Sequence, residues 1–481
     1  ARFLNDLFDF LSFMSELTQY FAQNQFCVLV EYLTSIKGQF PVKTEFAGFP
    51  ACMTLADRVH TDEDIAPLHA LASYPAQPEK VLHFSGKGRD IKDFERFLDQ
   101  AELAGQYNLL LVTGDKLKQH QYGDAVNPRS RYLESVNAVM AAKQRHGFAV
   151  GVALNPFKYT EAEKDAQYFK LEKKIKAGAD FIITQLGFDL SALKQAKAFL
   201  AEHQYPQKIL ACVMPLTLPR AQFMLKQQVA GIVITAHMLA ILTQEHSNNK
   251  HNQRDNSYRR CALQILMCKH LGFAGVHLSA CHKPEEQAKL AQYIEQYQSM
   301  DLGACEALWN ELWQLKSETA FYPEIMDAAT SASQYQVIKH QHLQLMHKLL
   351  FNAKLARGVG AFVFRAPIWS QSFTNKLLLK LEYISKHAIV GCETCGQCRL
   401  AETLYVCPET CPKGLANGPC GGTTLDRCEF GDRECIHSVK ARLAKAVKQT
   451  DILQTVLIPT VPIEIRGSSS WKNWYLATES N

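Results

Sequence analysis

The sequence lacks any apolar run that approaches the roughly 20 residues needed to cross a bilayer, so we expect no membrane-spanning segment and no membrane partner. It also lacks a long basic block: the 52 Lys and Arg residues are interspersed with 47 Asp and Glu, and the net charge is only +5. This balance argues against a nucleic-acid partner. The apolar N-terminal segment, residues 1–11, is interrupted by Asp and has helical spacing, so a signal peptide is not indicated and we expect a cytoplasmic protein.

The fifteen cysteines fall into two populations. Seven, including Cys212, are scattered and lie mostly inside apolar runs, as buried and unreactive thiols do. The other eight are concentrated between Cys392 and Cys435. An odd total with Cys-x-x-Cys spacing, and no secretion signal, indicates metal binding rather than a disulfide framework.

The clustered cysteines have the spacing of metal ligands. Cys392, Cys395 and Cys398 are each two residues apart, which places three thiolates on one tight loop. A later Cys-Pro closes many iron–sulfur sites, and here that cysteine is Cys407 or Cys411. Zinc uses the same thiolate geometry, and eight cysteines are also enough for two four-thiolate sites. We therefore predict a 4Fe–4S cluster or zinc, with ligands drawn from Cys392, Cys395, Cys398, Cys407, Cys411, Cys420, Cys428 and Cys435.

The first 300 residues predict an α/β fold of the (β/α)8 TIM barrel type. Short apolar runs rich in Val, Ile and Leu alternate with longer amphipathic stretches, as in parallel strands separated by helices. A ninth run, Val229–Thr235, is assigned to a helix or an irregular connection. The predicted strands are Phe26–Tyr32, Phe49–Leu55, Lys80–Ser85, Asn108–Thr113, Phe148–Leu154, Phe181–Leu186, Ile209–Met214 and Phe273–Leu278.

Composition divides the rest of the chain into three further parts. Residues 301–388 are a helix-rich connector, with a helix expected at Gln334–Ala356 and one strand at Gly358–Pro367. Residues 389–440 form a small cysteine-rich domain that has too few large apolar residues to fold without a metal. Residues 441–481 form a C-terminal tail, whose Trp471, Trp474 and Tyr475 are expected to pack on a neighbouring surface or subunit.

Polar residues stand at the ends of several predicted strands, where a (β/α)8 barrel carries its chemistry. Singly, each has a structural explanation as a cap, a turn residue or a satisfied core group. Together they predict a binding site at one mouth of the barrel. These residues are Glu31, Thr54, His83, Asp115 and Gln185.

Two stretches resemble the methylenetetrahydrofolate reductase family. The pattern CxxCGQC…CPxxCPKGLxNGPCGG, within His387–Cys435, resembles the cysteine-rich C-terminal domain of that family, and KKIKAGADFIITQLGFD, Lys173–Asp189, resembles its barrel. By this resemblance Glu31 is the catalytic acid, Asp115 lies near flavin and folate, and Gln185 binds folate. The positions that contact the cofactor are then Thr54, His83, Thr113, Gly114, Asn155, Tyr159, Lys173 and Lys174.

The resemblance implies a flavin-dependent oxidoreductase that interconverts 5,10-methylenetetrahydrofolate and 5-methyltetrahydrofolate in one-carbon metabolism. Its flavin would be FAD or FMN, reduced by NAD(P)H or by an electron-donor protein, and the chain could form a homo-oligomer. The C-terminal metal would relay electrons or stabilise the structure. The direction of the reaction stays open. A different class of function also stays open: a flavin-free module that binds folate or a methyl carrier, with a zinc-bound docking domain.

Overall fold

The computed structural model describes residues 15–33, 44–57, 66–74, 76–117, 132–315, 318–323 and 329–477. The N-terminal segment expected to be helical, residues 1–11, lies outside these ranges. Within them, no helix combines the length and the apolar character that crossing a membrane requires.

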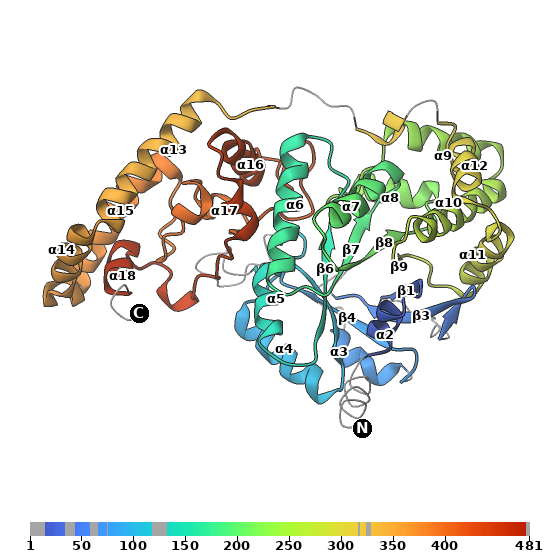
Figure 1. The fold of residues 1–481 in the computed structure, drawn as a ribbon, viewed down its shortest axis with the longest axis horizontal. Coiled ribbons are helices and arrows are strands. Elements are labelled where there is room, and N and C mark those ends of the chain that lie inside the picture. Colours follow the sequence, from blue (N-terminus) through green and yellow to red (C-terminus); the bar gives the residue numbers. More distant parts are fainter. Residues whose placement is uncertain are drawn as a thin grey trace.

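A closed barrel of eight parallel strands forms the first half of the described chain (Figure 1). The barrel closes because β1 pairs with both β3 and β9, and a short strand, β2 (Glu45–Phe46), adds to β3 in antiparallel orientation. The predicted TIM barrel is confirmed, and each predicted strand is present to within two residues. The eight strands are β1 (Cys27–Tyr32), β3 (Phe49–Leu55), β4 (Lys80–Ser85), β5 (Asn108–Val112), β6 (Ala149–Leu154), β7 (Phe181–Leu186), β8 (Lys208–Val213) and β9 (Gly275–Leu278).

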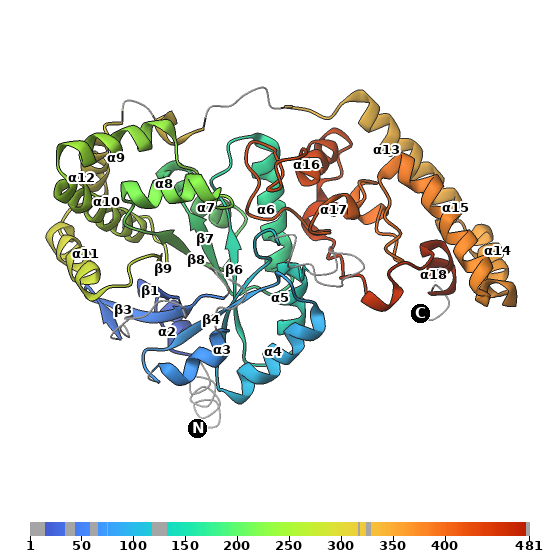
Figure 2. The ribbon, with the colours of Figure 1, turned by 180° about the vertical axis from the view of Figure 1, so that it is seen from behind.

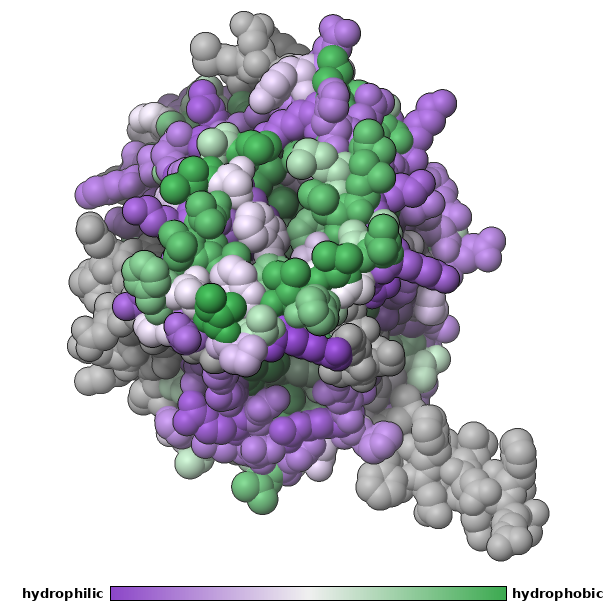
Figure 3. Space-filling view, turned by 90° about the vertical axis from the view of Figure 1, so that its left-hand side faces the viewer, coloured by the Kyte–Doolittle hydropathy of each residue, from purple (hydrophilic) through white to green (hydrophobic). Residues whose placement is uncertain are grey.

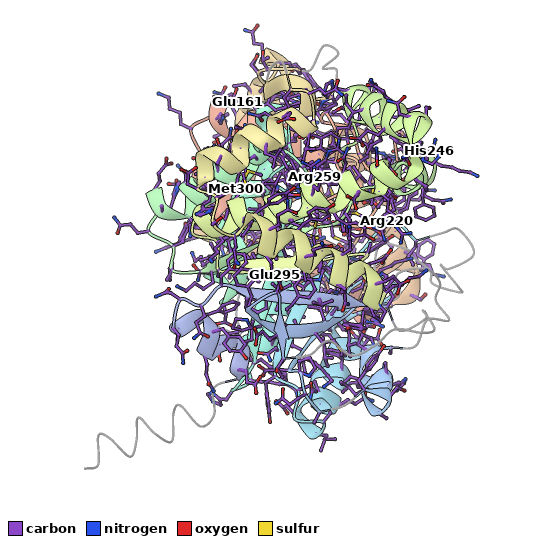
Figure 4. The ribbon with its side chains drawn as sticks, turned by 90° about the vertical axis from the view of Figure 1, so that its right-hand side faces the viewer. Glu161, Arg220, His246, Arg259, Glu295 and Met300 are labelled. Carbon is purple, nitrogen blue, oxygen red and sulfur yellow. The ribbon has the colours of Figure 1, made fainter. Side chains whose placement is uncertain are left out.

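Helices surround the barrel and protect its apolar strands from water. On the side away from the C-terminal lobe, Figure 4 shows Arg220 of α8, Arg259 of α10 and Glu295 of α11 on the covering helices. The ninth apolar run, Val229–Thr235, is an irregular connection between α8 and α9. The helices are α2 (Glu16–Ala22), α3 (Pro67–Ala70), α4 (Ile91–Leu103), α5 (Ser135–Lys143), α6 (Glu161–Lys176), α7 (Leu190–Glu202), α8 (Leu218–Gln227), α9 (Ala236–Asn248), α10 (Lys250–His270), α11 (Pro284–Tyr297) and α12 (Leu302–Leu312).

The C-terminal lobe lies beside α6 and has two layers (Figures 1 and 2). Its outer layer contains α13 (Gln334–His347), α14 (Lys354–Arg365) and α15 (Ser372–Val390). The cysteine-rich segment follows α15 and is succeeded by α16 (Ile436–Ala446), α17 (Thr450–Thr455) and α18 (Ser470–Ala477). The helices α16 and α17 both pack against α6. The cysteine-rich segment, which lies between α15 and α16 in the sequence, is therefore held against the barrel.

The predicted strand at Gly358–Pro367 is wrong, because α14 covers most of it. The helical period of this apolar run becomes visible only when the residues before it are included. Leu355, Val359 and Phe362 then recur at helical spacing. The predicted helix Gln334–Ala356 is present only as far as Asn352, where it ends in a π-helical turn at Lys348–Asn352. Ala353 has an extended backbone, and the last three predicted residues belong to α14. The tail aromatics pack within the chain, since the ring of Tyr475 stacks on Phe351, at 5.6 Å between centroids.

Candidate active site

Glu31 is a partly buried carboxyl group near the C-terminal end of β1. The strand register places it opposite Thr54 of β3. The hydroxyl of Ser279 and the backbone of Ala280, which directly follow β9, hydrogen-bond to its carboxyl group. Burial raises the pKa of Glu31 above its ordinary value, and these hydrogen bonds offset only part of that effect. The barrel thus favours a protonated carboxylic acid at this position.

A buried histidine, His277 of β9, links the polar groups around Glu31. Its Nε2 lies 2.9 Å from Thr54 Oγ1, and its Nδ1 lies 3.4 Å from both Cys212 Sγ and Ser279 Oγ. The ring of His83 lies 5.7 Å away, between centroids. Burial lowers the pKa of His83 to about 4, and burial followed by the neighbouring His83 lowers the pKa of His277 to about 3. Both rings are therefore neutral at physiological pH.

His83 Nε2 is buried and has no hydrogen-bond partner among the described residues. Buried polar atoms are nearly always hydrogen-bonded, so an orphaned ring nitrogen on the histidine next to His277 is suited to a polar group of a bound molecule. The sequence interpretation placed Thr54 and His83 at cofactor-contacting positions. It missed Cys212, His277 and Ser279, although His277 and Ser279 stand at the end of the eighth strand, where the same polar-residue rule applies.

Gly114 and Asp115 lie beside the C-terminal lobe. Lys413 Nζ donates to the Gly114 carbonyl oxygen, at 2.8 Å, and to Glu429 Oε2, at 2.5 Å. Partial burial, and after it the Glu429 carboxylate, raise the pKa of Asp115. Thr113 accepts the Ser135 N–H through its hydroxyl, at 3.2 Å. Gly114 is thus held by the contact between barrel and lobe, and the charge of Glu429 acts on Asp115, whereas Thr113 is held within the barrel by α5.

The loop Asn417–Thr423 of the cysteine-rich segment is seated on the end of β6 and on α6. Asn155 Nδ2 donates to the carbonyl oxygens of Gly231, at 2.9 Å, and Gly421, at 2.8 Å. Gln167 Nε2 donates to the Cys420 carbonyl, at 2.9 Å, and Lys170 Nζ to that of Gly418, at 3.1 Å. The backbones approach so closely that a Cβ on Gly231, whose φ is +73°, would lie 2.1 Å from the Gly421 oxygen.

The other predicted cofactor and folate positions have protein partners of their own. Lys174 Nζ donates to the Ala153 carbonyl, at 2.5 Å, and burial, then Lys170, lowers its pKa to about 7. Lys173 is fully buried, and burial, then Lys440, lowers its pKa to about 7. The Tyr159 ring packs against Tyr322, at 4.9 Å. Gln185 Nε2 donates to the Ala230 carbonyl, at 3.1 Å.

All fifteen cysteines carry free thiols, and the clustered eight divide into two sets of four. One pocket is lined by Cys392, Cys395, Cys398 and Cys407, which form the first set. In the second set, burial is the main cause that raises the pKa of each cysteine, and a neighbouring thiol of the same set adds to it; its members are Cys411, Cys420, Cys428 and Cys435. Within the described ranges, no group of three or more His, Cys, Asp or Glu residues has the arrangement of a metal site.

Comparison with known families assigns the two parts of the chain. The family model of methylenetetrahydrofolate reductase matches residues 68–294, and that of the methylene-tetrahydrofolate reductase C terminal matches residues 372–461. Both segments belong to the methylenetetrahydrofolate reductase family. Methylenetetrahydrofolate reductase 2 of Saccharomyces cerevisiae (strain ATCC 204508 / S288c) is 27% identical over 164 residues, which cover 33% of this chain and 27% of the yeast protein. The match thus spans about a quarter of the yeast protein.

Solved structures show more distant likeness to the barrel. An uncharacterized protein from Clostridium thermocellum that binds two copies of 5-methyl-5,6,7,8-tetrahydrofolic acid is 13% identical, with a TM-score of 0.41, and the match covers 59% of this chain and 99% of that chain. EDTA monooxygenase from Chelativorans sp. BNC1 is 10% identical, with a TM-score of 0.33, over 60% of this chain and 98% of that chain. Likeness at this level carries no argument about function.

Proposed function

We propose that this protein interconverts 5,10-methylenetetrahydrofolate and 5-methyltetrahydrofolate, with Glu31 as the proton donor. The observation that carries the proposal is the environment of Glu31: a partly buried carboxyl whose pKa is raised by desolvation, beside Thr54 and the neutral His277, at the C-terminal ends of the barrel strands. Such a group holds a proton near neutral pH and can deliver it to the folate nitrogen as the ring opens. In the opposite direction, ionised Glu31 takes the same proton back.

The proposal includes a flavin, which would supply the hydride to the folate methylene carbon. Thr54 and the orphaned His83 Nε2 fit a polar edge of such a group inside the barrel. Gly114 and Asn155 are committed to the C-terminal lobe, so on this side the loop Asn417–Thr423 would bound the cofactor pocket. We propose FAD or FMN bound between these groups, with Asp115 and Gln185 on the folate side. The electrons would come from NAD(P)H or from an electron-donor protein.

We further propose that the two cysteine sets are two metal sites. The first pocket places four thiols around one space, which suits a four-thiolate ligand set. The second set adjoins the barrel, because the backbone carbonyl of Cys420 accepts a hydrogen bond from Gln167 of α6. If the metals are iron–sulfur clusters, the second set is therefore the one placed to exchange electrons with a group in the barrel. If they are zinc, both sets stabilise the fold.

Substitution of Glu31 tests the proton-donor role. We expect Glu31→Gln to lower kcat for folate reduction by about 10²–10⁴-fold, the usual contribution of a general acid, while flavin content stays at the wild-type level. The wild-type rate should also fall as pH rises through the raised pKa of Glu31, and the variant should lose that dependence. Glu295→Gln, an exposed carboxylate on α11, is the matched control and should keep full activity. A near-wild-type rate for Glu31→Gln would refute the assignment.

Anaerobic purification with an absorption spectrum and metal analysis tests the cofactors. We expect a flavin spectrum and metal in both sites; Cys395→Ser should remove the metal of the first set only, and Cys428→Ser that of the second set only. The engagement of Gly114 and Asn155 by the lobe favours one alternative, a flavin-free folate-binding module with a zinc-bound docking domain. A colourless protein that contains zinc and binds folate would decide for that alternative.

A further inference from the structure

The outer helices of the C-terminal lobe bury very little of themselves. The helices α13, α14 and α15 contain 14, 12 and 19 residues. Isolated helices of this length are marginal in water and depend on packing of an amphipathic face. The residues that these helices bury are His340, Gly360, Ala361, Leu378, Glu382 and Val390. The described chain therefore supplies only part of the packing that this layer requires.

The same helices expose an extensive apolar surface, here termed the open helical face. Leu355 and Phe362 are each 81% exposed and Phe373 is 77% exposed. Figure 3, which views the molecule from the side of this lobe, shows apolar residues gathered on one face with polar residues around them. Monomeric proteins rarely expose a contiguous apolar patch larger than a few hundred Å². The members are Tyr335, Ile338, Leu345, Met346, Leu349, Leu350, Leu355, Val359, Phe362, Val363, Ile368, Phe373, Leu377, Leu381, Tyr383, Ile384 and Ile389.

The spacing of these residues is that of helices that pack against other helices. On α13 the outward row is Tyr335, Ile338, His342 and Leu345, with alternating steps of three and four residues. The opposite side of α13 docks on the lobe, where the His340 ring lies 5.4 Å from Tyr405. On α15 the row contains Phe373, Leu377, Leu381 and Ile384. Rows with this period form the seams of helix bundles.

We propose that a second copy of this chain covers the open helical face, so that the helix layers of two copies form one bundle across a two-fold axis. The exposed apolar side chains amount to roughly 1,000 Å², more than the roughly 800 Å² that each partner contributes to a standard stable interface. A layer that cannot stabilise itself needs a cover that is always present. A second copy has the same incompletely packed helix layer, and one two-fold contact between the two layers completes the packing of both.

The charge of the open helical face distinguishes a second copy of this chain from other possible partners by the effect of salt. The face is bordered by exposed basic residues, among them Lys348, Arg357 and Lys380. The one acidic residue in positions 329–391 is Glu382, which is 1% exposed and paired with Lys386 at 2.7 Å. In a dimer two basic borders repel, so added salt should strengthen the dimer. An acidic protein or an anionic bilayer would instead be held by these charges and released by salt.

Sedimentation of the purified full chain tests the proposal. We expect a dimer whose Kd falls about tenfold between about 50 mM and about 500 mM NaCl, because screening removes like-charge repulsion. Leu345→Glu with Leu381→Glu should give a monomer with unchanged far-UV circular dichroism. The control, Leu103→Glu, alters an equally apolar side chain that is 90% exposed on α4, and should stay dimeric. A second variant, Lys348→Glu with Lys380→Glu, should tighten the dimer at low salt and reverse its salt dependence.

Three results would overturn the proposal. The first is a wild-type chain that stays monomeric at every concentration and salt. The second is a dimer that persists in the double Leu→Glu variant while that variant keeps its fold. The third is a monomer that co-sediments with vesicles containing phosphatidylglycerol and is released by salt, which would assign the face to an anionic membrane. None of these results depends on folate chemistry, so the proposed function stands or falls separately.

Discussion

The barrel and the cysteine-rich segment differ in how they are held together. The barrel encloses one continuous cluster of buried apolar residues contributed by all eight parallel strands and by the helices around them. The second apolar cluster of the described chain, in the lobe, has four buried members: Leu404, Leu443, Ala444 and Leu453. Burial of apolar surface, the main stabilising term in folding, is thus concentrated in the barrel.

Polar contacts across the interface compensate in part for this difference. Glu134 is 4% exposed and pairs with Lys170 at 2.9 Å. Its Oε2 accepts the N–H groups of Ala416 and Asn417, each at 3.1 Å. Since these donors belong to the cysteine-rich segment, the barrel supplies hydrogen bonds that the segment cannot supply itself. The comparison teaches that the segment is an extension of the barrel surface rather than an independent unit.

Removal of the Glu134 side chain is expected to have the largest effect on the stability of the cysteine-rich segment relative to the barrel. Glu134→Ala leaves Lys170 charged and buried and leaves the Ala416 and Asn417 N–H groups without an acceptor. Breaking a buried ion pair in this way costs about 3–5 kcal/mol. We expect hydrogen exchange, followed by mass spectrometry, to accelerate in residues 414–424 and to stay unchanged in β7.

Two further variants serve as controls for this hydrogen-exchange measurement. Glu134→Gln with Lys170→Met removes both charges together and should restore most of the protection, because no unpaired charge is left behind. Lys92→Ala breaks an exposed ion pair between α4 and Glu464 of the tail, at 2.7 Å, and should leave exchange unchanged. Equal acceleration in β7 and in residues 414–424 would show that the two regions unfold as one unit, contrary to the comparison.

Sequence reasoning succeeded where the pattern was local and repeated. The eight strands were predicted because a strand buried on both faces must be an unbroken run of Val, Ile and Leu, as in Phe181–Leu186. The cap of α6 was readable as well, since Thr160 accepts the Glu163 N–H as a threonine at this position should. The strand predicted at Gly358–Pro367 failed because the helical period became visible only with Leu355 included.

The candidate site could be predicted only in part, because its partners are set by tertiary contacts. Glu31, Thr54 and His83 were predicted together, because polar residues on barrel strands are expected to meet at the C-terminal mouth of the barrel. That Gly114 would bind Lys413 and Asn155 would bind Gly421 could not be foreseen, since each contact joins residues more than 250 positions apart. Neither residue type carries a sign of such a partner.

Lowering the pH is expected to have a smaller and graded effect on stability. It should weaken the contribution of Glu134 at the interface and strengthen that of Glu31 in the barrel. Burial disfavours the ionised form of Glu134, but Lys170 and the N–H groups of Asn417 and Ala416 outweigh it, so the pKa of Glu134 lies below its ordinary 4.5. Its stabilisation is then present above that value and is lost as pH falls through the lowered pKa. Glu31 has a raised pKa, so its contribution is present at low pH and is lost as pH rises.

The interface should therefore loosen in acid before the barrel does. Near-UV circular dichroism should change below about pH 4.5 while far-UV circular dichroism, dominated by the barrel, stays constant to lower pH. The variant Glu134→Gln with Lys170→Met lacks the titrating pair and should shift this first transition or abolish it. A wild-type chain in which both signals change together, with the double variant indistinguishable from it, would mean that Glu134 does not govern the contact. The polar interface would then be a consequence of docking and not its cause.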